Sequence, residues 1–158
     1  MSFKIYLDTS VISAYFDYQK PVRQLITQKW TQQNAKEFDL FVSTLVLEEI
    51  DKNTDQEIKE KMLNLLNSLS ISILEVNDEI FKLASIYRDH TLPQEINDTV
   101  HIAIASCYAI DAIVSWNFRH IVNLKTMKMI HEINREQQYQ DIQILTLENL
   151  GGDQYGTL

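Results

Sequence analysis

Short apolar runs rich in isoleucine and valine alternate with longer amphipathic segments along this chain of 158 residues. The runs of strand length lie at 3–7, 40–42, 71–76, 112–114 and 142–145. Apolar residues recur with helical spacing at 13–33, 45–52, 56–69, 79–90, 98–109 and 125–137. Because strands that alternate with helices build parallel sheets covered on both faces, the pattern predicts an α/β fold of this kind.

The first predicted strand ends in an acidic residue. Asp8 directly follows the run at 3–7 and precedes Thr9 and Ser10, which are good helix-capping residues. In parallel sheets, ligand sites form just beyond the carboxyl ends of the strands. Asp8 is therefore either a cap of the following helix or a metal ligand at the edge of the sheet.

The second strand leads into the segment LVLEEI, which places two glutamates in the first turns of a helix. Adjacent residues on a helix point about 100° apart, so only one of the two can face the same site as Asp8. Glu48 has Lys52 four residues later, which suits a solvated ion pair. We therefore expect Glu49 to point inward, with an ordinary acidic first turn as the alternative.

A third acidic residue, Asp98, opens the segment DTVHIAIA, which is apolar on nearly all sides. A helix of this kind is buried, and a buried helix rarely begins with an acid unless the acid has a partner. Asp98 is thus a candidate site residue, with helix capping as the alternative. His101 follows one turn later, and we expect it to be a packing residue of the core rather than a ligand.

The composition excludes several classes of protein. All three glycines lie in the last eight residues, which excludes both the glycine-rich phosphate loop and the dinucleotide-binding fingerprint. The single cysteine, Cys107, cannot form an internal disulfide and favours a reducing cytoplasm. No stretch approaches the roughly 18 apolar residues of a membrane helix, and Asp8 interrupts the amino-terminal run too early for a signal peptide. We expect one domain over residues 1–150 and a flexible tail over 151–158.

In order along the chain, the pieces IYLDTSVIS, FVSTLVLEEI, NDTVHIAIA and IVSWNFRHI together resemble the PIN-domain family of metal-dependent ribonucleases, especially its VapC-like toxins. The resemblance implies a three-layer α/β/α sandwich with a central parallel sheet. It also implies an acidic pocket for Mg²⁺ or Mn²⁺, with Asp8, Glu49 and Asp98 as ligands. Oxygen ligands suit these ions, and a cation relieves the repulsion between clustered carboxylates.

The segment after the fourth strand departs from the family pattern. Many relatives carry an acid there, whereas this chain has Ser115, Asn117 and, three residues further on, His120. Asn117 is a candidate catalytic residue, because its amide can ligate a metal through oxygen or position a metal-bound water. The missing charge leads us to expect one metal ion rather than two.

An RNA substrate requires local positive charge, because Asp and Glu exceed Lys and Arg by 22 to 14 and give a net charge of −8. The segment 119–135 is locally basic and has Glu132 as its only acid. The candidate RNA contacts are Ser10, Arg119, His120, Lys125 and Lys128, although a solvated helix face has the same pattern. Trp116 either stacks on a base or belongs to the core.

The resemblance also implies partners, namely a small antitoxin protein and a second copy of the chain in a homodimer. Two other functions are compatible with parts of the sequence. A catalytically inactive PIN-like module that binds RNA or protein would explain Asn117 in place of an acid. A phosphatase of the haloacid-dehalogenase type also begins with a strand-end Asp, but it requires a second acid where this chain has Ser10.

Overall fold

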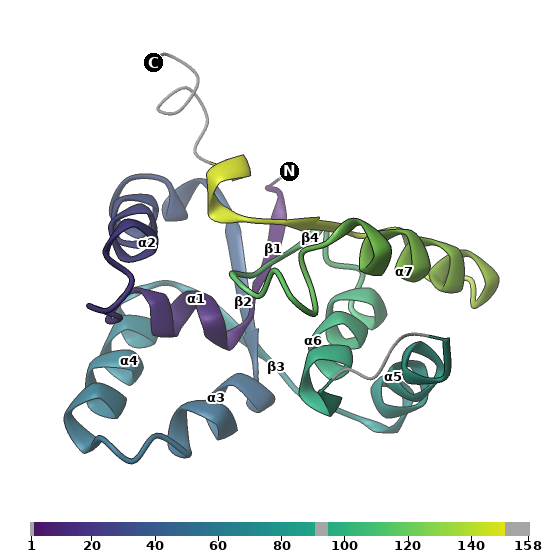
Figure 1. Cartoon of the computed structure of the whole chain (residues 1–158), viewed down its shortest axis with the longest axis horizontal. Coiled ribbons are helices and arrows are strands. Elements are labelled where there is room, and N and C mark those ends of the chain that lie inside the picture. The colour runs from purple at the N-terminus through teal and green to yellow at the C-terminus, as the bar shows by residue number, and fades with distance from the viewer. Residues whose placement is uncertain (1, 91–94, 151–158) are drawn as a thin grey trace.

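A five-stranded sheet lies at the centre of the computed structural model, which describes residues 2–90 and 95–150. Its strands are β1 (Lys4–Leu7), β2 (Asp39–Ser43), β3 (Ile71–Leu74), β4 (Ala112–Val114) and β5 (Gln143–Leu145). The α-helices are α1 (Thr9–Ala14), α2 (Pro21–Gln33), α3 (Thr44–Asp51), α4 (Gln56–Ser68), α5 (Asp78–His90), α6 (Ile96–Cys107) and α7 (Leu124–Glu136). Two short 3₁₀ helices are η1 (Ala35–Glu37) and η2 (Leu147–Leu150). Figure 1 shows these elements in chain order.

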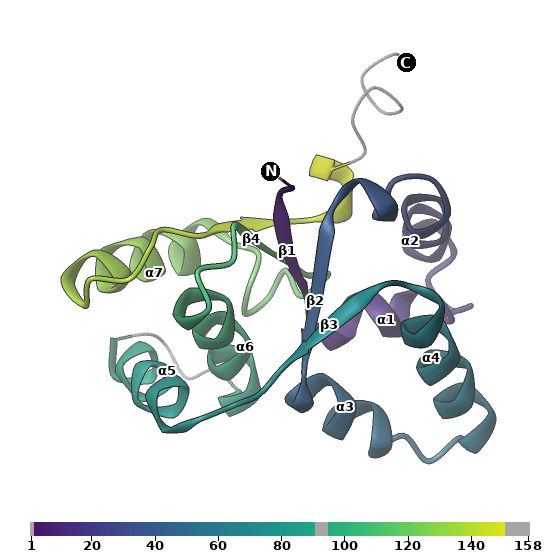
Figure 2. The same ribbon diagram turned by 180° about the vertical axis from the view of Figure 1, so that it is seen from behind.

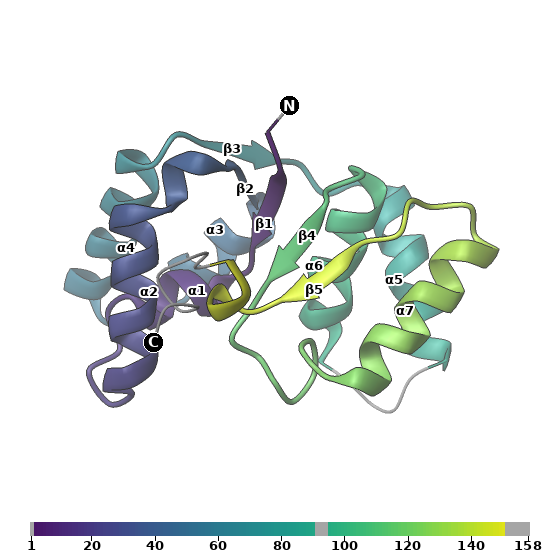
Figure 3. The same ribbon diagram turned by 90° about the horizontal axis from the view of Figure 1, so that it is seen from above.

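Helices cover both faces of the sheet. One group contains α1, α2, α3 and α4, and α1 packs against the other three. The second group contains α5, α6 and α7, with α5 packed against both of the others (Figure 3). Figure 2 shows the same two groups from behind. The predicted three-layer α/β/α sandwich is confirmed.

All neighbouring strands are parallel, in the order β3-β2-β1-β4-β5. The chain leaves β1 for β2 and β3 on one side, then crosses to β4 and β5 on the other side. This change of direction places a topological switch point between β1 and β4, where Leu7 pairs with Val114. The residues that follow these two strands therefore border the crevice in which α/β proteins bind ligands.

The prediction of one helix over 13–33 is wrong, because two helices occupy this stretch. The first, α1, begins at Thr9 and ends at Ala14, and α2 begins at Pro21. Proline lacks the backbone N–H that the first turn of a helix does not need, and it disfavours helical geometry at the residue before it. Lys20 accordingly has the non-helical angles φ −125° and ψ 74°.

The core supports the sheet from both sides. Ile5, Tyr6 and Leu7 of β1 and the whole of β4 are buried, as expected for central strands of a parallel sheet. Helix α6 is buried from Thr99 to Ser106, which confirms the prediction of a core helix.

Within the described residues, no helix has the length and apolar character needed to cross a membrane. The tail expected at 151–158 lies outside the described residues.

A buried hydrogen-bond cluster joins the three helices of the second group. The Tyr87 hydroxyl of α5 donates to Asn134 of α7, whose amide nitrogen donates to the Ser106 hydroxyl of α6 over 2.9 Å. All three side chains are buried. Buried polar groups cost free energy when they lose their partners, so the cluster constrains how α5, α6 and α7 pack together.

We predict that Asn134→Ala lowers the free energy of unfolding by about 1–3 kcal/mol, because it removes partners of two buried hydroxyls. Urea denaturation followed by circular dichroism measures this difference. Glu132→Ala, at an exposed position of the same helix, is the control and is expected to change stability little. Equal stability of the two variants would show that the cluster contributes nothing.

Candidate active site

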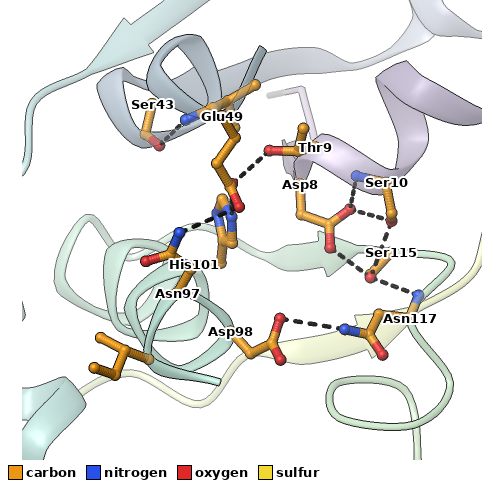
Figure 4. Close-up of polar contacts among 12 residues, drawn as sticks. Asp8, Thr9, Ser10, Ser43, Glu49, Asn97, Asp98, His101, Ser115 and Asn117 are labelled. Carbon is orange, nitrogen blue, oxygen red and sulfur yellow. Dashed lines mark hydrogen bonds and ion pairs between the residues drawn. The ribbon is translucent and has the colours of Figure 1, made fainter. Parts of the chain in front are cut away.

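The three acidic residues singled out in the sequence lie at one edge of the sheet and come from different elements. Asp8 follows β1, Glu49 is part of α3, and Asp98 lies in the first turn of α6. Figure 4 shows their carboxylates around one space beyond the carboxyl ends of the strands. The fold thus brings together residues that are 90 positions apart in the chain.

Asp8 is buried and held by hydrogen bonds at both carboxylate oxygens. Oδ1 accepts from the backbone N–H of Ser10 (3.0 Å) and from its hydroxyl, so Asp8 also caps α1. Oδ2 accepts from the Ser115 hydroxyl over 2.6 Å. Burial raises the pKa of the Asp8 carboxyl, while the charge of His101 and the hydrogen bonds from the two serines act in the opposite direction.

Asp98 has one carboxylate oxygen with a partner and one without. Oδ1 accepts from the side-chain amide of Asn117 over 3.2 Å, whereas Oδ2 is buried and has no hydrogen-bond partner. The pKa of Asp98 is raised to about 6, because burial and the charges of Asp8 and Glu95 outweigh the lowering effect of His120 and His101. An unpartnered carboxylate oxygen in this position is costly, so it marks a place for a ligand.

Glu49 has hydrogen-bond partners at both carboxylate oxygens. Its Oε1 accepts from the Thr9 hydroxyl (2.7 Å) and contacts His101 Nε2 (2.6 Å), and its Oε2 accepts from Asn97 (3.3 Å). Burial by itself would raise the pKa of Glu49, but the hydrogen bond and charge of His101, together with the other two bonds, lower it. The inward orientation expected for Glu49 agrees with these contacts, whereas Glu48 is exposed.

His101 has a role that the sequence interpretation missed. The side chain is buried, as expected of a packing residue, but it joins Glu49 to the core. Its Nδ1 lies 2.7 Å from the Tyr6 hydroxyl, which in turn lies 2.8 Å from the Ser43 hydroxyl. Asn97 and His101 are four residues apart on α6 and therefore share one face of the helix. That spacing was the available signal that the two side chains point the same way, and the fold supplies Glu49 as their partner.

Asn117, in the turn after β4, forms hydrogen bonds through both polar atoms of its side chain. Its amide nitrogen donates to Asp98, and its Oδ1 accepts from the backbone N–H of His120 over 3.0 Å. Its own backbone N–H donates to the Ser115 hydroxyl that also holds Asp8. In this arrangement the Asn117 nitrogen positions Asp98 and its oxygen accepts one backbone hydrogen bond, and the catalytic role of Asn117 stays a prediction.

The oxygen atoms of these acids are ligands of the kind that a divalent cation needs. Asp8 and Asp98 fit, because the buried carboxylate of Asp8 and the buried, unpartnered Oδ2 of Asp98 match the preference of Mg²⁺ and Mn²⁺ for oxygen ligands. Among residues 2–90 and 95–150, however, no group of three or more His, Cys, Asp or Glu side chains is placed to hold a metal ion. The ligand set of Asp8, Glu49 and Asp98 stays a prediction, and Glu49 is bonded to His101.

The candidate RNA contacts beyond Ser10 lie in the turn after β4 and in α7. Arg119, Lys125 and Lys128 are exposed, and none of them takes part in an ion pair within the described part of the chain. The charge of His120 lowers the pKa of Asp98, which indicates that this side chain lies near the acidic site. Exposed positive charges of this kind suit contacts with phosphate groups.

A parallel sheet with acids gathered at its switch point is the arrangement expected of a PIN domain. Residues 5–122 match the PIN domain family, which is more than half of the chain. The chain therefore belongs to the PIN domain family. No curated protein matches the sequence at a significant level.

Solved structures of VapC toxins and toxin–antitoxin complexes share this fold. VapC20 of Mycobacterium tuberculosis, a sarcin-ricin loop cleaving toxin, is 13% identical with a TM-score of 0.60, over 73% of this chain and 92% of that chain. VapBC2 of Rickettsia felis, bound to a promoter DNA fragment, is 14% identical with a TM-score of 0.55. The match covers 90% of this chain and 98% of that chain. A toxin–antitoxin complex of Klebsiella pneumoniae is 11% identical with a TM-score of 0.56. The match covers 77% of this chain and 93% of that chain.

Proposed function

We propose that this protein is a metal-dependent endoribonuclease and the toxin of a VapBC-like toxin–antitoxin pair. The observation that carries the proposal is the buried, unpartnered Oδ2 of Asp98 beside Asp8, at the switch point of a PIN-domain sheet. A cation bound there lies where ligands of parallel α/β proteins bind. The similarity in fold to VapC20, which is described as a toxin that cleaves the sarcin-ricin loop, supports RNA as the substrate.

The residues around the cation each have a positioning role. Asp8 and Asp98 would hold Mg²⁺ or Mn²⁺, which when bound stabilises negative charge on the phosphate and lowers the pKa of an attacking water. Ser10 and Ser115 fix both oxygens of Asp8. Asn117 fixes one oxygen of Asp98 and leaves the other for the ligand.

Glu49 has a separate role in the proposed reaction. Because its pKa is lowered, the carboxylate is ionised at neutral pH. His101 and Thr9 both bond to Oε1, and this fixes the orientation of the group. Oε2 has only the longer bond from Asn97, so it can accept a hydrogen bond from a water molecule beside the substrate.

We predict that His101→Leu lowers the rate of cleavage by about 10- to 100-fold, as is typical when a group that orients an active-site carboxylate is lost. His101→Gln, which keeps a hydrogen-bond donor, should recover part of this loss. Turnover number and Michaelis constant are measured separately, with thermal stability recorded for both variants. A His101→Leu protein with the turnover number of the wild type would remove this residue from the mechanism.

A panel of single-stranded and structured RNAs, incubated with purified protein freed of any bound partner, tests the activity. Discrete internal cleavage products support the endoribonuclease. The second candidate function is a PIN-like module that binds RNA or protein without cleavage, and the amide at position 117 in place of an acid favours it. Binding of the RNAs without products from any of them would establish this second candidate.

The proposed partners are RNA, a small antitoxin protein and a second copy of the chain, within the cytoplasm. Two solved structures with this fold are a VapBC assembly and a toxin–antitoxin complex, which supports the antitoxin. Mass spectrometry of the protein purified from its native cells, together with light scattering, tests both protein partners. Recovery of the chain alone and as a monomer would contradict them.

A further inference from the structure

A groove lined by aromatic and cationic side chains lies beside the acidic site. The guanidinium carbon of Arg23 is 5.2 Å from the ring centroid of Trp116 and 5.5 Å from that of Phe118. These distances are those of cation–π contacts. The groove has a volume of about 420 Å³, and its other lining residues are Lys20, Pro21, Val22, Ile26 and Glu148. Sites for small ligands have volumes of about 300–1,000 Å³.

Trp116 and Phe118 contribute to this groove in different ways. Trp116 is buried, and its indole N–H donates to the Thr27 hydroxyl of α2 over 2.9 Å. It therefore belongs to the core, and its ring packs against the guanidinium group of Arg23. Phe118 is 47% exposed, so its ring is accessible to a ligand. Phe118 and Arg23 thus form a cation–π pair whose aromatic ring is exposed in the groove.

The groove and the acidic site are built from the same turn. Trp116 and Phe118 are the neighbours of Asn117, whose side chain bonds to Asp98. The backbone N–H of Trp116 donates over 2.9 Å to the Ser10 hydroxyl, which also holds Asp8. The turn after β4 therefore carries residues of the groove and residues that hold the two aspartates of the acidic site.

We infer that this groove binds an unpaired base of the RNA, stacked on Phe118 and on the guanidinium of Arg23. The inference rests on the proposed function and adds a preference for single-stranded or loop RNA. Every base has a π face that stacks on aromatic rings and on guanidinium planes. Arg23 and Lys20 place two positive charges against the one negative charge of Glu148, which suits a phosphate chain. Bases within a duplex are already stacked and paired, so only an unpaired base can enter.

Fluorescence anisotropy tests the inference with fluorescein-labelled RNA of about ten nucleotides. The measurements are made in chelator, because the proposed nuclease needs a divalent cation and would otherwise cleave the RNA. We expect Phe118→Ala and Phe118→Leu each to weaken single-strand binding by about tenfold, and Phe118→Tyr to retain it. The same RNA annealed to its complement should bind weakly and equally to all variants. Phe81→Ala is the matched control, because Phe81 of α5 has a similar exposure of 52%.

Several results would overturn the inference. These are unchanged single-strand binding by Phe118→Ala, the same loss with duplex as with single-stranded RNA, or full binding by Phe118→Leu. A change in oligomeric state with no change in RNA binding would assign the face to a protein partner instead. Loss of binding in Phe118→Ala, in a protein that cleaves no RNA, would retain the base site and reject only the nuclease.

Discussion

Asp98→Asn is expected to reduce RNA cleavage by about a thousandfold or more, because it removes one of the two carboxylates that would hold the catalytic cation. The substitution keeps the shape of the side chain and changes only its charge and one donor group. In the metal-free protein it also removes a charge that burial and Asp8 disfavour. The thermal midpoint without metal should therefore be equal to or higher than that of the wild type.

Lost activity together with retained stability would show that Asp98 is needed for the reaction and not for folding. Asp89→Asn is the matched control, since Asp89 is an exposed aspartate of α5 outside the acidic site. It should cleave RNA as the wild type does. If Asp98→Asn cleaved at the rate of the control, the carboxylate at position 98 would have no part in the reaction, and the proposed metal site would be rejected.

Removal of divalent cations is the second large effect that we expect. Chelation should lower cleavage to the level of an incubation without protein, and Mg²⁺ or Mn²⁺ in excess should restore it. A cation at one hundred times its dissociation constant stabilises a protein by about 2.7 kcal/mol. For a chain of this size, that shifts the thermal midpoint upward by roughly 5–10 °C.

The thermal shift gives a readout that is independent of activity. We expect Asp98→Asn to show little or no shift on addition of the cation, and Asp89→Asn to show the full shift. Cleavage that persists in chelator would contradict the metal requirement. A full shift in Asp98→Asn would place the cation somewhere other than beside Asp98.

Local sequence patterns were sufficient to predict the fold class and the order of the acids along the chain. Buried parallel strands are short and rich in branched apolar residues, and amphipathic helices repeat their apolar residues every three to four positions. These local signals predicted the alternation of strands and helices and the position of Asp8 after β1. The prediction of a single helix over 13–33 was wrong, because it followed the apolar periodicity and gave too little weight to Pro21, where α2 begins.

The connections within the site depend on contacts between distant parts of the chain. His101 and Glu49 are 52 residues apart, and Ser115 and Asp8 are 107 residues apart. No local pattern encodes which donor a buried carboxylate meets, because the order of the strands and the packing of α6 decide it.

The sequence by itself therefore determined the α/β architecture and the position of Asp8 after the first strand, since both follow from local periodicity and chain order. Only the tertiary structure decided that Asp98 keeps an unpartnered oxygen, that His101 bonds to Glu49, and that Arg23 stacks against Phe118. The physical reason is that hydrogen bonds and ring contacts form between atoms within a few ångströms of each other. The folded topology sets those distances, and neighbouring residues in the sequence do not.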